Sequence, residues 1–165
     1  MIDQVVAYVK SKCDSYEVYL QKSNKIDIEI ANTKLSAMSQ GSVEGLGVRV
    51  EIDKKIGFAS TNNLDDFKKC VDIAIKIAKL NKKDEKFVSF AKPGKYPSVK
   101  SYDKKLANWT EQEIHEFLKD IIDKTKDAKT GIIRGGYERA ISNYQIINSE
   151  GVNVSHSLYF SIINP

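Results

Sequence analysis

"VEGLGVRVEIDKKIGFASTNNLD", residues 43–65, is the stretch of the sequence whose pattern decides the fold. Apolar residues alternate from position 46 to position 52, which predicts a strand with one buried face. Asp53-Lys54-Lys55 then form a turn into a second strand at 56–60, and Asn62-Asn63 precede a helical pattern. Such a short spacer favours an antiparallel pair, because parallel strands need a long crossover. The stretch therefore predicts a β-hairpin that leads into a capped helix.

The glycines of this hairpin are not arranged as in a phosphate-binding loop. A P-loop needs GxxxxGK[ST], and a dinucleotide loop needs GxGxxG between a strand and a helix. Here Gly45-Leu46-Gly47 leads into a strand, so no helix N-terminus is presented to a phosphate. Glycines inside a strand mark a bend or the close approach of another segment, and Gly135-Gly136 are given the same role.

Outside the hairpin, the apolar period alternates between 3.6 and two, which predicts alternating helices and strands. Helices are predicted at 2–12, at 63–80 and from Thr110 onward, where Thr110 and Glu113 form a capping box. Residues 81–107 are rich in lysine and are predicted to form a long surface connection.

Further strands flank these helices. Ser23-Asn24 are predicted to form a turn between two of them, and Asn32-Thr33-Lys34 a bulge. The remaining strands are predicted at 16–20, 26–37, 133–141, 144–148 and 152–163. The last of these alternates apolar residues to its end and stops abruptly, so we expect it to belong to a longer polypeptide. Together the elements predict an α+β fold, with an antiparallel sheet of about six to seven strands and about three helices packed on it.

Composition limits the class of protein. The chain has 165 residues, 41% hydrophobic and 29% charged, which suits a single α+β domain over 1–165. A net charge of +4 is too mild to indicate a nucleic-acid-binding protein. No apolar run is long enough to span a bilayer and no secretory signal is present, so a cytoplasmic location without membrane attachment is expected.

The residues that could carry chemistry form no catalytic or metal-binding set. Cys13 and Cys70 lie far apart and in no CxxC pair, which excludes a typical zinc site and a disulfide framework. His115-Glu116 begin an HExxH-like stretch, but Lys119 occupies the second histidine position and cannot be a ligand. His156 lies on the apolar face of the last predicted strand and is interpreted as a core histidine. We therefore assign no catalytic residue and no metal ligand.

Several short motifs occur together in a recognisable order. They are Gly45-Leu46-Gly47-Val48-Arg49-Val50, then Gly57-Phe58-Ala59-Ser60-Thr61, then Asn63-Leu64, and finally Asn148-Ser149-Glu150-Gly151. In this order the chain resembles the N-terminal region of the TldD/PmbA family, over essentially its whole length. Members of this family are described as zinc metallopeptidases and as modulators of DNA gyrase.

The resemblance implies a two-part protein. Zinc would be bound only by an HExxxH motif in a C-terminal β domain, which is not present in this chain. The PmbA type lacks the zinc ligands, and the two types pair as a heterodimer around a cavity that admits unfolded peptides. The Asn148–Gly151 turn favours the PmbA type, although the deciding residues would be C-terminal.

From the resemblance we expect a structural, substrate-cavity and dimerisation role in a peptidase that acts on unfolded peptides. The partner would be a TldD/PmbA-type subunit, in a homodimer or a heterodimer. The residues expected to contact substrate or partner are Gly45, Gly47, Arg49, Gly57 and Phe58. The alternative is a non-enzymatic interaction module that binds protein or nucleic acid.

Overall fold

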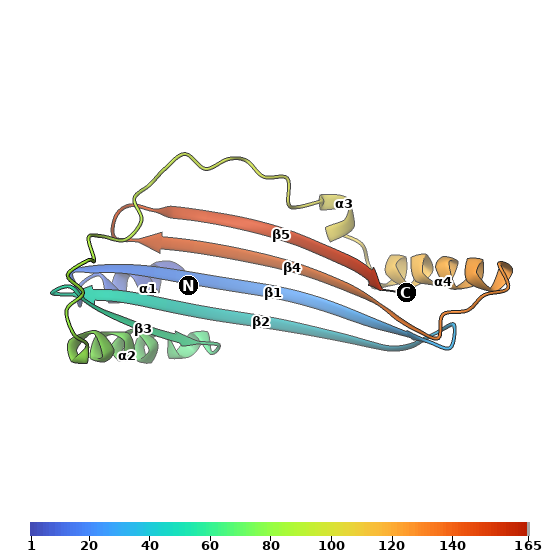
Figure 1. Cartoon of the computed structure of the whole chain (residues 1–165), viewed down its shortest axis with the longest axis horizontal. Helices are drawn as coiled ribbons and strands as arrows, with labels where there is room; N and C mark the ends of the chain where they lie inside the picture. The colour runs from blue at the N-terminus through green and yellow to red at the C-terminus, as the bar shows by residue number, and fades with distance from the viewer. Residues whose placement is uncertain (165) are drawn as a thin grey trace. The chain divides into compact units, whose positions relative to one another are not determined.

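The computed structural model describes residues 1–164 and contains one five-stranded sheet with helices (Figure 1). The order of the strands in the sheet is β3-β2-β1-β4-β5, and β2 and β3 pair antiparallel. The predicted α+β class is therefore confirmed. The elements are α1 (Ile2–Val9), β1 (Ser15–Ala31), β2 (Lys34–Ile52), β3 (Lys55–Thr61), a 3-10 turn (Leu64–Asp66), α2 (Phe67–Leu80), α3 (Lys104–Ala107), α4 (Glu111–Asp127), β4 (Arg134–Asn148) and β5 (Asn153–Asn164).

Five strands form where six to seven were predicted, because three predicted breaks are continuous strand, one of them at 38–45 inside β2, while the strand predicted at 26–37 is divided by a turn. β1 passes through the expected turn at Ser23-Asn24, and β4 joins the strands predicted at 133–141 and 144–148. The reason lies between neighbouring strands, where the Ser23 and Ser142 hydroxyls share a hydrogen bond of 2.8 Å. Each turn-forming residue thus finds its partner across the sheet instead of in a local turn.

The true turn between β1 and β2 is at Asn32-Thr33, where a bulge was predicted. Both residues have positive φ, 50° and 60°, as a two-residue hairpin turn of the mirror-image type requires. The turn is held from outside by the segment before β4, because Asn32 N–H donates to Ile133 O (3.0 Å) and Thr33 N–H to Ile132 O (2.8 Å). The Thr33 hydroxyl also accepts from Ile132 N–H. This clamp offsets the strain of a β-branched residue at positive φ.

The helices agree with the predictions at their caps. The capping box of α4 is complete, with Thr110 accepting from Glu113 N–H and Glu113 accepting from Thr110 N–H. The helix predicted at 63–80 begins with the 3-10 turn, capped by the Asn63 side chain. A fourth, short helix, α3, was missed inside the predicted connection, where Asp103 caps two N–H groups. Asp103, a single carboxylate among lysines, was the feature of the sequence that could have predicted this helix.

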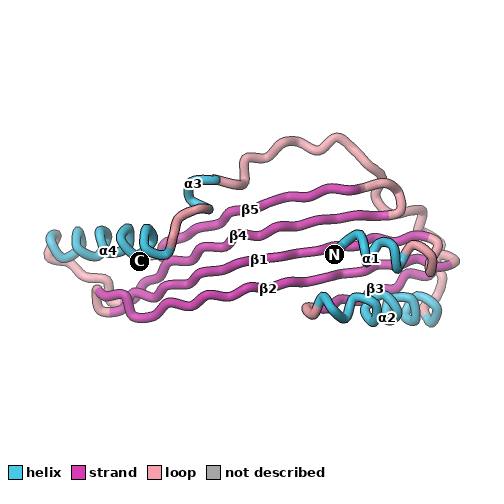
Figure 2. Tube along the Cα trace, turned by 180° about the vertical axis from the view of Figure 1, so that it is seen from behind, coloured by secondary structure: helices cyan, strands magenta, loops and turns pink. Residues whose placement is uncertain are grey.

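The chain divides into two compact units, each with its own core. Unit 1 comprises 1–22, 43–98 and 143–156, and its core lies between α1, α2 and the sheet. α1 and α2 cover the same face of the sheet in this unit, in front of the strands in Figure 2. Its fully buried side chains include Val18, Val48 and Val71, one each from β1, β2 and α2.

Unit 2 comprises 23–42, 99–142 and 157–165, and its core lies between α4 and the strands. Its buried residues are Ile26, Ile28 and Ile30 of β1, Ile114, Leu118 and Ile122 of α4, and Tyr137 of β4. The buried residues of β1 lie at even positions, and those of α4 lie at positions 114, 118 and 122. Each element therefore has one apolar stripe, and the two stripes pack together. The prediction of a single domain over 1–165 stays a prediction.

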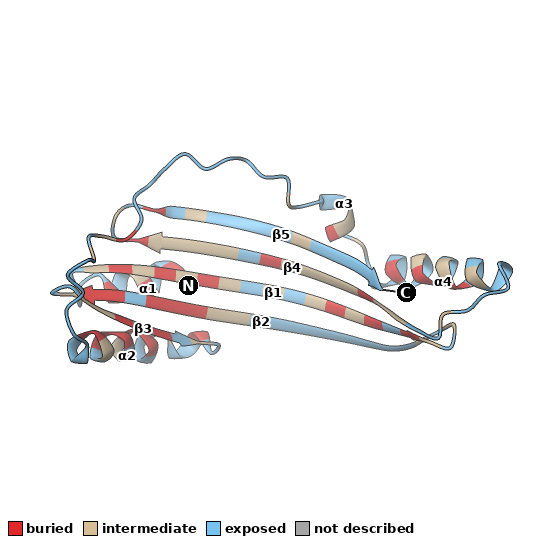
Figure 3. Cartoon of the chain, in the orientation of Figure 1, coloured by how far each residue is buried: buried red, intermediate tan, exposed pale blue. Residues whose placement is uncertain are grey.

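The last strand corrects one sequence interpretation. His156 is exposed, so its assignment as a core histidine is wrong. The apolar residues in phase with it are also partly open, with Phe160 at 44% and Leu158 at 37% of full exposure (Figure 3). β5 is the outermost strand of the sheet, so its apolar alternation does not by itself bury it.

Candidate functional site

The open face of the sheet in unit 1 carries a cleft of about 830 Å³. It lies on the side of the strands that α1 and α2 leave uncovered, because its strand residues alternate with those of the core. Its lining residues come from all of β1 to β4: Glu17, Tyr19, Val43, Glu44, Gly45, Leu46, Gly47, Arg49, Phe58, Ser60, Thr61, Asn62 and Ile146.

The floor of the cleft is the β2–β3 pair. The register places Arg49 opposite Phe58 and Gly47 opposite Ser60. The Phe58 ring lies diagonally over Gly47, where an added Cβ would be 3.4 Å from a ring carbon. The ring is nevertheless 54% exposed. Gly47 therefore leaves the space in which an exposed aromatic ring lies flat.

Arg49 is held beside this ring by two neighbours. Its guanidinium forms an ion pair with Glu17, with the Nε atom 3.1 Å from Glu17 Oε1, and it lies 5.5 Å above the Phe90 ring. The Arg49 side chain is 51% exposed, whereas that of Glu17 is 14% exposed. The carboxylate thus fixes the guanidinium, whose outer surface remains available at the edge of the cleft.

An aromatic pair extends the apolar surface across β1 and β4. The rings of Tyr19 and Tyr144 are stacked with centroids 6.3 Å apart. Tyr19 lines the cleft directly, together with Ile146 and Val43. None of these residues was predicted from the sequence to line a site. The signal that could have found Tyr19 is its position out of phase with Val18 and Leu20, on the opposite face of the strand.

The cleft brings together four of the five residues expected to contact substrate or partner: Gly45, Gly47, Arg49 and Phe58. Gly57 lies on the other face of the sheet. A Cβ at Gly57 would meet Ala74 O at 2.0 Å and Ala78 N at 2.5 Å, so α2 packs directly on its backbone. Gly57 therefore positions the helix and does not line the cleft.

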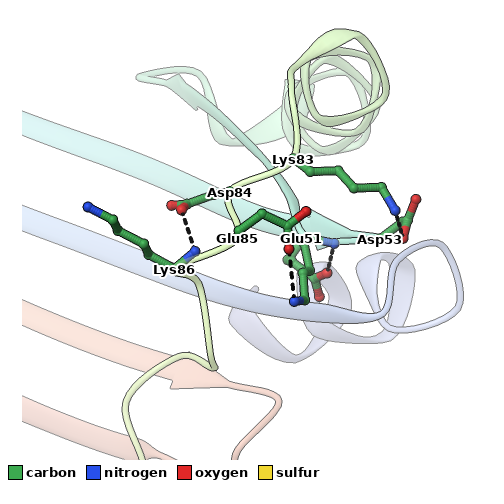
Figure 4. Close-up of polar contacts among 7 residues, drawn as sticks. Glu51, Asp53, Lys83, Asp84, Glu85 and Lys86 are labelled. Atoms are coloured by element: carbon green, nitrogen blue, oxygen red, sulfur yellow. Dashed lines mark hydrogen bonds and ion pairs between the residues drawn. The ribbon is translucent and has the colours of Figure 1, made fainter.

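One buried carboxylate, Glu51, stabilises the turn after β2 (Figure 4). It accepts hydrogen bonds from the Ser15 hydroxyl (2.9 Å) and from Lys54 N–H (2.5 Å). Outside it, Lys54 pairs with Glu85 at 3.2 Å. Because its hydrogen bonds go to a hydroxyl and a backbone N–H of the turn, Glu51 has a structural role.

The segment after α2 completes this arrangement. Lys83 pairs with Asp53 at 2.7 Å, and this hydrogen bond lowers the pKa of the Asp53 carboxyl. Asp84 N–H donates to Lys54 O at 2.8 Å. The charged residues after α2 thus hold the β2–β3 turn in place.

Within residues 1–164, no group of three or more His, Cys, Asp or Glu side chains is placed to hold a metal ion. His115 is exposed on α4. Burial, together with the negative charges of Asp14 and Glu51, raises the pKa of the Cys13 thiol to about 11. In the same part of the chain, no helix has both the length and the apolar character needed to cross a membrane.

A second cleft, of about 750 Å³, lies in unit 2 beside the first turn of α4. Trp109, Gln40 and Arg139 line it, and the Arg139 guanidinium donates to Trp109 O at 2.6 Å. The Gln40 amide is bonded to Glu111. The Gln40, Glu111 and Arg139 side chains of this second cleft are therefore already bonded within the protein.

Two sequence comparisons match the chain. Residues 16–78 match the family model described as PmbA/TldA metallopeptidase domain 1. An uncharacterized protein of Methanocaldococcus jannaschii is 31% identical over 147 residues, which are 88% of this chain and 34% of that protein.

Solved structures share the fold. TldE from Thermococcus kodakarensis superposes with a TM-score of 0.82 at 23% identity, covering 98% of this chain and 38% of that chain. A Thermotoga maritima protein described as a candidate modulator of a DNA gyrase superposes with a TM-score of 0.81 at 17% identity, covering 98% and 37%. The chain therefore spans little more than a third of the length of these relatives.

The matched residues coincide with the structural features that carry the site. The family model covers β1, β2 and β3, which supply most of the cleft, and most of α2, which packs on Gly57. The match to PmbA/TldA metallopeptidase domain 1 and the fold shared with TldE support membership of the TldD/PmbA family, in its N-terminal region.

Proposed function

We propose that this chain forms part of the substrate cavity of a peptidase assembly that acts on unfolded peptides, and that it takes part in subunit assembly. The observation that carries the proposal is the cleft with exposed Phe58 at its floor, in a chain of the PmbA/TldD family. In this proposal peptide hydrolysis would depend on a zinc site outside this chain, which would supply an activated water.

The chemistry of the cleft suits apolar side chains of an unfolded segment. Phe58 and Tyr19 offer ring faces, and Val43 and Ile146 add aliphatic surface. Aromatic side chains contribute much of the apolar area that is buried at binding surfaces. The Arg49–Glu17 pair supplies a polar border that can contact the peptide backbone. Such a site would hold unfolded chains of varied sequence.

The test of this proposal is the Phe58→Ala substitution in the intact assembly. We expect the affinity for a fluorescently labelled, unstructured peptide rich in leucine and phenylalanine to fall about tenfold, since a central aromatic contact is lost. Fluorescence anisotropy measures the binding. Leu80→Ala is the control, because Leu80 is an apolar side chain that is 86% exposed and does not line the cleft. Equal affinities of the two variants would contradict the proposal.

A second test addresses the whole region. Removal of residues 1–165 from the assembly is expected to abolish peptide binding. Unchanged binding after that deletion would place the peptide site elsewhere.

A weaker candidate function is a non-enzymatic interaction module that binds nucleic acid. The observation in its favour is a small patch where Lys12 and Lys68 lie 3.8 and 5.8 Å from the Tyr8 ring centre, beside Phe67. Cations next to aromatic rings suit a single-stranded nucleic acid. However, Asp72 lies within 2.9 Å of Lys12 and reduces the positive potential. A salt-titrated DNA-binding assay decides the question, and no binding at low salt excludes this function.

A further inference from the structure

The second cleft, beside the first turn of α4, is lined by a cation that has no ion pair. Among the described lysines and arginines of unit 2, Lys25 and Arg139 are partly buried and the others are exposed. Lys25 pairs with Asp27 (3.0 Å) and with Glu138 (3.2 Å). Arg139 forms no ion pair with a described residue. Charges drawn out of water are usually balanced by an opposite charge, so Arg139 is an exception that a bound anion would balance.

The Arg139 guanidinium is held in position but keeps unused donors. Its Nη1 atom donates to Trp109 O at 2.6 Å, and the guanidinium makes no other hydrogen bond to a described residue. A guanidinium has five N–H donors, and the parallel pair on Nε and Nη2 matches the two oxygens of a carboxylate. Because the Trp109 carbonyl is neutral, it orients the guanidinium without cancelling its charge.

Apolar side chains lie in the same cleft. Three of them line it: Ile26 of β1, Ile141 of β4 and Trp109 before α4. The Trp109 ring packs on Phe117, with ring centroids 5.3 Å apart and the planes at 62°. A cleft of about 750 Å³ has the size of a site for an organic ligand rather than for an inorganic ion. The cleft thus offers an apolar wall beside an oriented cation.

The other charged groups of the cleft limit the charge of the ligand. Glu111 lines it, and its carboxylate accepts a hydrogen bond from the Gln40 amide. Lys25 lines it too, but its charge is balanced by its two ion pairs. One unpaired guanidinium near a carboxylate favours a ligand with a single negative charge, because Glu111 would repel the additional charge of a phosphate. A carboxylate attached to an apolar group therefore fits the cleft.

We propose that the second cleft binds the free C-terminus of a peptide that ends in an apolar residue. Arg139 binds the terminal carboxylate through two parallel N–H groups, and the last side chain packs against Trp109 and Ile141. Much of the remaining lining is polar, including Asn24 and Ser42, which suits a peptide backbone better than the tail of a fatty acid. This binding does not depend on the proposed function, which concerns the cleft at Phe58.

The fluorescence of Trp109 measures the binding directly, because this residue is the only tryptophan of the chain. The probes are the peptide acetyl-Gly-Ser-Gly-Leu with a free C-terminus and the same peptide with a C-terminal amide. We expect the free acid to bind about tenfold more tightly, since the amide loses the charge-assisted hydrogen bonds to the guanidinium. Equal affinities, or no change in fluorescence with either peptide, would overturn the proposal.

Substitutions test the role of each charge. Arg139→Gln should weaken binding of the free acid about tenfold and leave binding of the amide nearly unchanged, so the preference disappears. Lys25→Gln is the matched control, because it removes a cation of the same cleft whose charge is already paired, and it should keep the preference. Glu111→Gln should strengthen binding of the free acid, because a repelling charge is lost. An unchanged preference in Arg139→Gln would rule out Arg139 as the carboxylate ligand.

Circular dichroism shows whether each variant is folded. The comparison of acid and amide in the unaltered chain needs no variant, so it decides the proposal even if Arg139→Gln does not fold.

Competition with other anions tests the class of ligand. Inorganic phosphate and octanoate are each added to the complex with the free-acid peptide. Octanoate offers a carboxylate and an aliphatic tail without a peptide group. Both should compete much more weakly than unlabelled free-acid peptide of another apolar end, acetyl-Gly-Ser-Gly-Val. Competition by phosphate or octanoate as strong as that of this peptide would contradict the assignment of a peptide C-terminus.

The Phe58→Ala variant separates this inference from the proposed function. It should keep the preference for the free acid, because Phe58 belongs to unit 1 and does not line the second cleft. If acid and amide bind equally while Phe58→Ala weakens binding of the unstructured peptide, only the C-terminus site is wrong. If the preference is found while Phe58→Ala binds the unstructured peptide normally, only the proposed function fails.

Discussion

Gly57 is the residue on which the packing of α2 depends. The backbone of α2 at Ala74 lies where a Cβ of residue 57 would be, at 2.0 Å. Neither a helix carbonyl nor a strand can move away without disturbing the core between them. At this position glycine is required by the close approach of two backbones.

Gly57→Ala is therefore expected to lower the free energy of unfolding by about 2 kcal/mol or more, as overpacking against backbone does. Urea unfolding followed by circular dichroism measures the change. Gly45→Ala is the control, because no atom lies within 4 Å of its added Cβ, and it should change stability by less than about 0.5 kcal/mol. Equal transition midpoints for the two variants would show that α2 does not pack on Gly57.

The Cys13 thiol should react slowly despite its partial exposure. Its pKa is raised to about 11, chiefly by burial, so the reactive thiolate is scarce at pH 8.5. We expect alkylation by iodoacetamide at that pH to be about a hundredfold slower than for an unfolded cysteine, and to rise through pH 10 to 11. Mass spectrometry follows the modification, with the urea-unfolded chain as reference. A rate that levels off by pH 9 would be inconsistent with the raised pKa.

At the scale of elements, α4 depends on its first turn. Thr110 and Glu113 exchange hydrogen bonds across this turn, and the bonds from the Thr110 backbone N–H and hydroxyl lower the pKa of the Glu113 carboxyl. A carboxyl whose pKa is depressed in the folded state contributes stability above its unfolded pKa and loses it as the pH falls through the folded pKa. The capping box should therefore weaken in acid.

Thr110→Ala should cost about 1 kcal/mol at pH 7, whereas Thr110→Ser should be nearly neutral because serine also caps. The difference between Thr110→Ala and the parent should shrink in acid, as the pH falls through the lowered pKa of Glu113 and its carboxyl becomes protonated. Thermal unfolding at pH 7 and pH 3 measures both effects. A loss that is independent of pH would mean that Glu113 takes no part.

At the scale of the whole molecule, the sequence predicted the features that depend on residues close together in the chain. The hairpin at 46–61 and the cap at Thr110 follow from residues close in the chain, and both formed where predicted. Strand continuity at Ser23 did not follow, because its partner Ser142 lies 119 positions away. The exposure of His156 depends on the order of the strands in the sheet, which the alternation of apolar residues along one strand does not reveal. The four cleft residues that belong to the motifs (two glycines, an arginine and a phenylalanine) were predicted from the sequence. Only the alternation of side chains along the strand shows that Phe58 and Gly57 lie on opposite faces of the sheet.

The two units also predict how a shortened chain behaves. Unit 1 needs residues 143–156, where Ser149 N–H donates to Tyr16 O (2.9 Å) and the Asn148 side chain to Ala91 O (2.8 Å). A chain ending at residue 142 should therefore unfold without a cooperative transition, although it retains α1, α2 and the first three strands. Urea unfolding of the shortened and intact chains makes the comparison. A sharp transition in the shortened chain would mean that residues 1–142 fold cooperatively without residues 143–156.

The interleaving of the two units has a consequence during synthesis. Each unit is assembled from three separated segments, and the Asn32-Thr33 turn is clamped by residues 132 and 133. A nascent chain thus exposes the uncharged stretch at 36–43 well before residue 133 leaves the ribosome. Neighbouring nascent chains on one messenger could meet through that stretch before either has folded. Slow translation between residues 43 and 133 would prolong the exposure, and a chaperone bound to that stretch would shorten it.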